Sequence, residues 1–256
     1  MRYGARQALS GLDLEVGFGE VVGILGPNGA GKTSLLRLLC TGRLPSGGTL
    51  VILGHPVSPS SRSLVSLRRQ IGIAGDEAVH TDALTGQENL EFFAQLGGLE
   101  RAAAQARGRA ILSRFGLDSD ADRPVAHYSL GMRRKLLLAQ ALVHDPRLII
   151  LDEPTTGLDK AGRDALRSML RERAASGAAI VLASNDPLEP QRVCDRVIFL
   201  HKGRVILAGK PDELIARLGA SEPVEIRRPD LADVFLAATG AELVPDSRFA
   251  LRNSPS

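Results

Sequence analysis

The chain has 256 residues, of which 44% are apolar and 24% charged, and it carries a net charge of +3. This length allows one large or two small domains with a substantial core, and the composition is ordinary for a water-soluble globular protein. The basic residues are spread along the chain and form no block, so nucleic-acid binding is not indicated.

The first strong pattern is a buried strand that leads into a glycine-rich turn. Residues 12–16 alternate and predict a strand with one polar face, whereas residues 21–25 are apolar throughout, like a central strand covered on both sides. Residues 26–33 read GPNGAGKT, and residues 32–39 predict a helix. Because the N–H groups of such a turn and the helix N-terminus attract phosphate, this segment predicts a nucleoside triphosphate site. The alternative is a glycine-rich turn that ends in Lys-Thr by chance and binds no nucleotide.

The residues of this turn have distinct predicted roles. Its glycines permit a tight backbone close to phosphate, Lys32 reaches the β and γ phosphates, and the Thr33 hydroxyl is a ligand for Mg²⁺. The predicted ATP-binding residues here are Gly26, Pro27, Asn28, Gly29, Ala30, Gly31, Lys32, Thr33 and Ser34.

Further along the chain, strands and helices alternate. Residues 48–54 and 69–74 predict strands, and helical spacing then dominates from residue 85 to 143, as in a helical insertion. Strand patterns return at residues 148–151, 179–182 and 196–200, with a helix predicted over residues 160–175. The alternation predicts an α/β fold with a mainly parallel sheet, whose ligand binds at the carboxyl ends of the strands.

Two carboxylates follow the apolar residues 148–151. Asp152 and Glu153 are costly at the end of a buried strand unless they meet a cation, so we expect Asp152 to bind Mg²⁺ and Glu153 to orient a water molecule. A structural interpretation would make both residues a helix cap, but Pro154 and Gly157 predict a loop before the next helix.

Together these motifs resemble the nucleotide-binding subunit of an ATP-binding cassette (ABC) transporter. Residues 26–33 and 148–153 are similar to the two nucleotide motifs of the family, residues 128–132 to its signature, and residues 155–159 to the loop that connects the two sites of a dimer. The match covers about residues 1–210. It implies a P-loop NTPase core with an antiparallel β subdomain and a helical subdomain at about residues 77–145, and the use of ATP and Mg²⁺.

The resemblance also implies roles across a dimer. The signature residues Ser129, Leu130, Gly131 and Met132 would close on the nucleotide of the opposite subunit, and Asp159 belongs to the dimer loop. Viewed alone, Ser129 is equally an ordinary helix cap. Tyr3 is similar to the aromatic residue that stacks on adenine, although a tyrosine near a terminus also serves in packing or at the surface.

Two positions depart from the family pattern. Asp76 occupies the place of a glutamine that senses the metal, and Gln87 lies too far along to replace it. Asn185 occupies the place of a histidine that contacts the γ-phosphate, and an amide donates a hydrogen bond without becoming cationic. With Glu153 these are the predicted catalytic residues, and the two changes predict slow turnover.

The predicted partners follow from the absence of a membrane span. No apolar run approaches the roughly eighteen residues that cross a bilayer, and charge and glycine interrupt the N-terminus, unlike a signal peptide. The resemblance therefore implies a separate transmembrane permease, docked near residues 76–90, and a second nucleotide-binding subunit, identical or paralogous. It places the chain at the cytoplasmic face of the cell membrane, in an exporter of the drug, lipid or polysaccharide type.

Two other functions stay open at this stage. Asp76 and Asn185 also suit a regulatory subunit that binds ATP in a mixed dimer with little hydrolysis of its own. A cassette protein that acts on ribosomes or DNA is less consistent with the chain, which has no tandem cassette, coiled-coil insertion or basic arm.

The predicted domains are a nucleotide-binding domain over residues 1–218 and a C-terminal extension over residues 219–256. Residues 211–237 predict a small appended αβα unit, and residues 246–256 a frayed tail. The start at residues 2–4 lacks the strand that commonly precedes this point in the family, which leaves open a missing edge strand or a truncated start.

Overall fold

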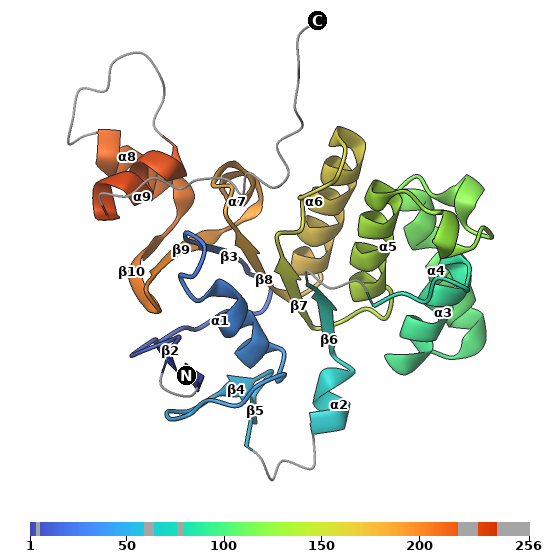
Figure 1. Cartoon of the computed structure of the whole chain (residues 1–256), viewed down its shortest axis with the longest axis horizontal. Coiled ribbons are helices and arrows are strands. Elements are labelled where there is room, and N and C mark those ends of the chain that lie inside the picture. The colour runs from blue at the N-terminus through green and yellow to red at the C-terminus, as the bar shows by residue number, and fades with distance from the viewer. Residues whose placement is uncertain (4–5, 59–63, 76–78, 220–229, 240–256) are drawn as a thin grey trace, which may run out of the picture.

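The computed structural model describes residues 1–3, 6–58, 64–75, 79–219 and 230–239, and it centres on a six-stranded sheet (Figure 1). The order of the strands is β10-β9-β3-β8-β7-β6, with five parallel strands and an antiparallel β10. The strands are β3 (Val21–Leu25), β6 (Ile71–Ala74), β7 (Leu148–Asp152), β8 (Ala179–Ser184), β9 (Arg196–His201) and β10 (Arg204–Gly209). The predicted α/β fold with a mainly parallel sheet is confirmed.

Helices cover both faces of this sheet, which explains why its central strands are mostly apolar. In β7, Leu148 and Ile150 belong to a core that includes α1 (Lys32–Leu39). Ile149 and Leu151 belong to the opposite core, which includes α5 (Leu130–Leu142). That second core also contains residues of α3 (Gly86–Leu96), α4 (Arg101–Arg114) and α6 (Lys160–Ala175).

Smaller elements surround the sheet. Two antiparallel pairs are formed by β1 (Arg2–Tyr3) with β2 (Arg6–Gln7) and by β4 (Val51–Ile52) with β5 (His55–Pro56). The short helices are α2 (Leu64–Arg68) and α7 (Leu188–Val193), with 3-10 turns at Asp118–Asp120 and Val125–His127. These pairs and β10 supply the antiparallel part of the predicted fold.

The C-terminal helices pack against the sheet. They are α8 (Pro211–Gly219) and α9 (Leu231–Thr239), and Phe235 stacks on Phe199 of β9 with ring centroids 5.7 Å apart. The strand of the predicted αβα unit falls on residues 220–229, and the predicted frayed tail on residues 246–256, both outside the described residues. The boundary at residue 218 stays a prediction, and α8 ends one residue later.

Two predicted strands differ from the structure. Residues 12–16 form no strand; Leu12, Leu14 and Val16 pack on the core, but no backbone ladder joins the segment to a neighbour. The alternation of apolar and polar residues indicates that one face of the segment is buried, but it does not ensure that a neighbouring strand forms hydrogen bonds with its backbone. The strand predicted over residues 48–54 shrinks to the two residues of β4, because the chain turns back at once into β5.

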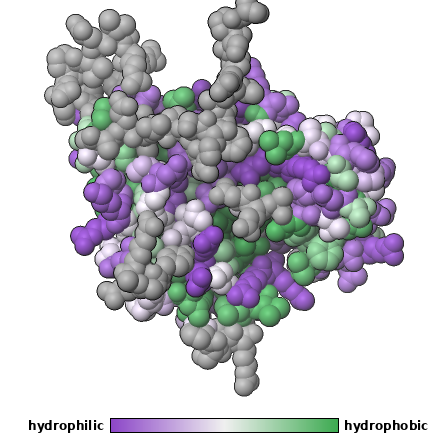
Figure 2. All heavy atoms as spheres, in the orientation of Figure 1, coloured by the Kyte–Doolittle hydropathy of each residue, from purple (hydrophilic) through white to green (hydrophobic). Residues whose placement is uncertain are grey.

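The surface is mixed in character. Hydrophilic residues are spread over the face in Figure 2, and apolar residues gather near its centre and along its lower edge. None of the helices in the described ranges has both the length and the apolar character that a membrane span requires.

Candidate functional site

The candidate site lies at the carboxyl ends of three neighbouring parallel strands. In the sheet, β8 lies between β3 and β7. The phosphate loop follows β3, the acidic pair comes at the end of β7, and Ser184 and Asn185 come at the end of β8. Segments that are far apart in sequence therefore meet at one edge, as expected for a parallel sheet.

The phosphate loop has the backbone that its glycines predict. Gly29 and Gly31 have φ angles of 80° and 111°, in the left-handed region that favours glycine. A Cβ on Gly29 would meet nothing within 4 Å, whereas one on Gly26 would lie 2.2 Å from the Leu200 carbonyl oxygen. The loop is thus packed against β9 at one end and open at its tip.

Lys32 is buried at the start of α1, with 7% of its surface exposed. Its Nζ donates to the carbonyl oxygen of Gly26 at 2.7 Å and to Oδ1 of Asn185. The Nδ2 of Asn185 donates in turn to Oδ1 of Asn28 at 3.1 Å. The amide of Asn185 therefore bridges the lysine and the tip of the phosphate loop.

Thr33 and Asp152 form a second contact between the loop and β7. The Thr33 hydroxyl donates to Oδ2 of Asp152 over 3.1 Å, and Asp152 is buried while Thr33 is exposed. Two oxygen ligands of the kind that Mg²⁺ prefers thus lie side by side at the mouth of the loop.

Glu153 is the most perturbed carboxyl group of the site. Burial raises its pKa to about 7, and the negative charge of Asp152 adds to that rise, while Lys32 opposes it. One oxygen, Oε2, accepts a hydrogen bond of 3.2 Å from the Ser184 hydroxyl. The other, Oε1, is buried without a hydrogen-bond partner in the described part of the chain. A buried carboxylate oxygen with no partner suits a bound water molecule.

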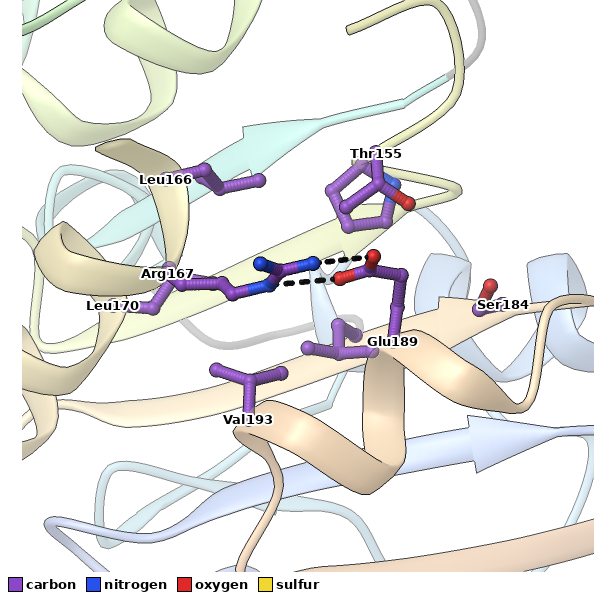
Figure 3. A pocket seen from close by; sticks show the side chains of 9 residues that line it. Thr155, Leu166, Arg167, Leu170, Ser184, Glu189 and Val193 are labelled. Carbon is purple, nitrogen blue, oxygen red and sulfur yellow. Dashed lines mark hydrogen bonds and ion pairs between the residues drawn. The ribbon is translucent and has the colours of Figure 1, made fainter. Parts of the chain in front are cut away.

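An ion pair between α6 and α7 lies next to the end of β8. Arg167 of α6 donates to both carboxylate oxygens of Glu189 in α7, at 3.0 and 2.6 Å (Figure 3). The pair lines a cavity of about 10 Å³, room for about one water molecule, together with Thr155 and Ser184. It fixes α7, and with it the loop that carries Asn185, against α6.

The signature residues lie on the other face of the sheet. Ser129 caps α5, and its hydroxyl accepts from the backbone N–H of Met132 over 3.2 Å. Leu130 is 72% exposed, and Gly131 follows it in the first turn of the helix. Because α5 packs in the core opposite to that of α1, these residues form a separate, exposed helix start. The helix cap, which was the alternative interpretation of Ser129, is present, and the role of Ser129 across a dimer stays a prediction.

Asp159 caps α6 and contacts α5. Its Oδ1 accepts from the Gly162 N–H over 2.8 Å, and its Oδ2 accepts from Lys135 over 3.1 Å. The hydrogen bond from the Gly162 N–H lowers the pKa of Asp159 most, and the hydrogen bond from Lys135 lowers it further. The predicted dimer loop is thereby tied to the helix that begins at the signature.

Of Tyr3, Asp76 and Gln87, only Gln87 has a described side chain, and it lies apart from this group. Tyr3 pairs with Arg6 in a short antiparallel ladder, and its side chain lies outside the described part of the chain, as does Asp76. Gln87 is buried in the helical region, where its amide donates to Glu91 and to the Gln105 carbonyl. As expected, it does not take the place at the end of β6.

Two contacting residues were not predicted from the sequence. Ser184 binds Glu153, and Arg134 of α5 donates to the carbonyl oxygens of Asp152 and Glu153 at 2.8 and 2.5 Å. The position of Ser184 at a strand end was a usable signal. For Arg134 the only signal was its place three residues after Gly131.

The residues present fit ATP and Mg²⁺. An open glycine tip, a buried lysine, a hydroxyl next to a carboxylate, and a Glu153 oxygen that no described residue contacts by a hydrogen bond are groups that suit phosphoryl transfer. Within the described residues, no group of three or more His, Cys, Asp or Glu side chains could hold a metal ion alone. Phosphate oxygens would have to complete the coordination of a magnesium ion here.

Comparisons with known proteins identify relatives along most of the chain. The family model described as ABC transporter matches residues 9–156. Daunorubicin resistance ATP-binding protein DrrA3 of Streptomyces coeruleorubidus is 42% identical over 239 residues, which cover 93% of this chain and 72% of that protein. Nod factor export ATP-binding protein I of Burkholderia orbicola is 38% identical over 231 residues, covering 90% and 75%.

Solved structures share the fold. An ATP-binding subunit of an ABC transporter superposes with a TM-score of 0.82 at 30% identity, covering 93% of this chain and 95% of that one. The dimeric bacterial ABC transporter cassette MJ0796 gives a TM-score of 0.73 at 25% identity, covering 79% and 90%.

Proposed function

Because the chain belongs to the ABC transporter family, we propose that it is the ATP-binding and ATP-hydrolysing subunit of an exporter. The names of relatives from two groups, daunorubicin resistance and Nod factor export, support the outward direction. Within the predicted drug, lipid or polysaccharide class of cargo, the daunorubicin and doxorubicin resistance names support the drug type. The cargo pathway belongs to a separate permease.

One observation carries this proposal: three strand ends bring the phosphate loop, the acidic pair and Asn185 together. Lys32 contacts Asn185, Thr33 contacts Asp152, and Glu153 contacts Ser184 at the same edge of the sheet. None of these pairs is close in sequence. Their meeting supports a single centre for phosphoryl transfer.

We assign nucleotide binding to residues 26–34 and to Tyr3. The N–H groups of the loop and of the first turn of α1 would bind the phosphates, with Lys32 at the β and γ phosphates. Thr33 and Asp152 would hold Mg²⁺, which neutralises charge on the phosphates when it is bound. Tyr3 would stack on adenine.

Glu153 and Asn185 would act on the γ-phosphate. Oε1 of Glu153, which has no partner in the described residues, would accept a hydrogen bond from the attacking water and then its proton. The water oxygen bonds to the γ-phosphorus as the bond to the bridging oxygen breaks. Asn185 Nδ2 would donate to the developing charge on the phosphate.

A second nucleotide-binding subunit, identical or paralogous, would complete each site. The start of α5, residues 129–132, of which Ser129 and Leu130 are exposed, would close on the nucleotide of that subunit, and Asp159 would lie in the loop between the two sites. The cassette structures with which this chain shares its fold include a dimer. The exposure of Leu130 in this chain supports a contact that forms on closure.

The permease would dock near residues 76–90. Exposed apolar side chains lie close to this segment, at Ile73, Val79, Phe92 and Leu96, with exposed fractions of 45–59%. Such side chains support a protein interface. Through that contact the chain would act at the cytoplasmic face of the membrane. The nucleotide-binding domain would span residues 1–218, with residues 219–256 as an extension.

The altered sensors would slow turnover. Asn185 donates a hydrogen bond but carries no positive charge, so it stabilises a charged phosphate less than a protonated histidine does. Asp76 adds negative charge where the family has a neutral glutamine. The phosphate loop, Lys32 and the proposed Mg²⁺ ligands would still bind Mg-ATP, with the contact from Lys32 to Asn185 exchanged for one to a phosphate oxygen.

Phosphate release from Mg-ATP by the purified full-length chain tests the assignment. We expect Glu153→Gln to lower turnover by about 100-fold or more while ATP binding, measured by calorimetry, stays within about threefold. Asn185→His should raise turnover or leave it unchanged. Turnover that is unchanged in Glu153→Gln would overturn the catalytic role of Glu153. Slower turnover in Asn185→His would overturn the proposal that Asn185 slows hydrolysis.

A further inference from the structure

Arg134 reaches from α5 to the ends of two strands beside the site. Its Nη1 donates to the Gly75 carbonyl oxygen at 3.0 Å, directly after β6. Its Nη2 donates to the carbonyl oxygens of Asp152 at 2.8 Å and of Glu153 at 2.5 Å, at the end of β7. One guanidinium therefore binds three carbonyl groups on two neighbouring strands.

The backbone that Arg134 binds is strained. Glu153 has a φ angle of 45°, in the left-handed region that side chains other than glycine rarely adopt. Such a conformation persists only where the surrounding contacts define it. The Glu153 N–H donates to the Ala183 carbonyl oxygen at 2.9 Å, and the Glu153 carbonyl oxygen accepts from Thr156 at 3.2 Å as well as from Arg134. Arg134 is the only one of these three partners that acts through a charged side chain.

The position of this backbone decides where the carboxylate points. Oε2 is fixed by the Ser184 hydroxyl, and Oε1 has no partner in the described residues. With one oxygen held, a shift of the Glu153 backbone moves the other oxygen relative to the phosphate loop. A displacement of about 1 Å in such a group costs on the order of 100-fold in rate.

The shape of the arginine side chain matters here as much as its charge. A guanidinium presents donors in a planar fork, so separate nitrogens reach Gly75 and the pair of residues after β7. A lysine has a single nitrogen and would leave part of this set unbound. The lysine substitution therefore separates geometry from charge.

We propose that Arg134 is a positioning residue for Glu153: it holds the ends of β6 and β7 so that Oε1 faces the attacking water. The inference rests on the proposed ATP hydrolysis. It assigns to α5, the helix that begins with the signature, a second role in the site of its own subunit.

The test uses Arg134→Lys in the full-length chain, with Arg173→Lys as the matched control. Arg173 donates to the Pro146 carbonyl oxygen at 2.9 Å, near the opposite end of β7, so its substitution also removes a guanidinium from a backbone carbonyl. We expect Arg134→Lys to lower kcat about 10- to 100-fold and to change the KM for ATP less than twofold. Arg173→Lys should leave both within twofold.

A double substitution shows whether Arg134 acts through Glu153. In single-turnover phosphate release, Arg134→Lys should add less than twofold to the loss caused by Glu153→Gln, because residues that act as a unit are not additive. Multiplicative losses, an unchanged kcat, or an equal loss in Arg173→Lys would overturn the inference and leave the proposed function standing. If the lysine variant does not fold, Arg134→Gln, which keeps two donors, takes its place under the same criteria. A wild-type chain without Glu153-dependent hydrolysis would overturn both proposals.

Discussion

Neutralising Glu153 should stabilise the nucleotide-free chain, and more so at high pH. Burial raises the pKa of Glu153 from its ordinary 4.5 to about 7. The folded state thus favours the neutral carboxyl group, whose contribution to stability is fully present below about pH 4.5 and is lost as the pH rises through about 7. Above that pH the penalty of the ionised group approaches about 3 kcal/mol.

The size of the expected effect follows from the same values. At pH 5.5 about 1.4 kcal/mol of the penalty is already present, so the full change up to pH 8 is about 2 kcal/mol. Solvent screening at the half-buried side chain reduces this figure, and we expect the advantage of Glu153→Gln to grow by about 1 to 2 kcal/mol over this range.

Urea unfolding measures this difference directly. The chain has no tryptophan, so circular dichroism should follow the transition, in the absence of nucleotide, for the wild type and for Glu153→Gln. Asp13→Asn removes an exposed carboxylate and controls for net charge. A stability difference that stays constant or shrinks as the pH rises would refute the argument that burial of the ionised Glu153 destabilises the folded chain.

Two further substitutions test the packing around the site. Gly72→Ala would place a Cβ 1.9 Å from the Ala141 carbonyl oxygen, and we expect the free energy of unfolding to fall by about 3 kcal/mol or more. Gly47→Ala is the control, because a Cβ there would meet no described atom within 4 Å. Equal stability of the two variants would contradict the close packing of α5 against β6. Asp159→Ala removes the cap of α6 and the partner of Lys135 and should cost about 1 kcal/mol in a thermal melt, whereas Asp159→Asn should retain most of that stability.

The strands of the sheet could be predicted because their signal is local. Residues 21–25, 148–151 and 179–183 are apolar throughout, since helices bury both of their faces. Residues 12–16 show the limit of such patterns. Their alternation matches burial of one face, but strand pairing also needs a neighbour with free backbone groups, and only the tertiary structure supplies one.

Within the site, too, some residues could be predicted from the sequence and others could not. The phosphate loop and the acidic pair are contiguous motifs, so their residue types predict their chemistry. Arg133 and Arg134 are adjacent and alike in sequence, yet Arg133 binds Asp82 and the Ala126 carbonyl oxygen while Arg134 binds the strand ends. The direction of a side chain on α5 relative to the sheet separates them, and no local pattern records that direction.

Asn185 contacts two residues of the phosphate loop. Its amide oxygen accepts from Lys32, and its amide nitrogen donates to Asn28, so one neutral side chain meets both a donor and an acceptor of the phosphate loop. Lys32 is therefore already paired without a phosphate, and binding at the proposed site would exchange the Asn185 oxygen for a phosphate oxygen. An exchange of partners yields less free energy than a new contact. Asn185 would thus act on the proposed phosphate-binding lysine as well as on the charge that develops during hydrolysis.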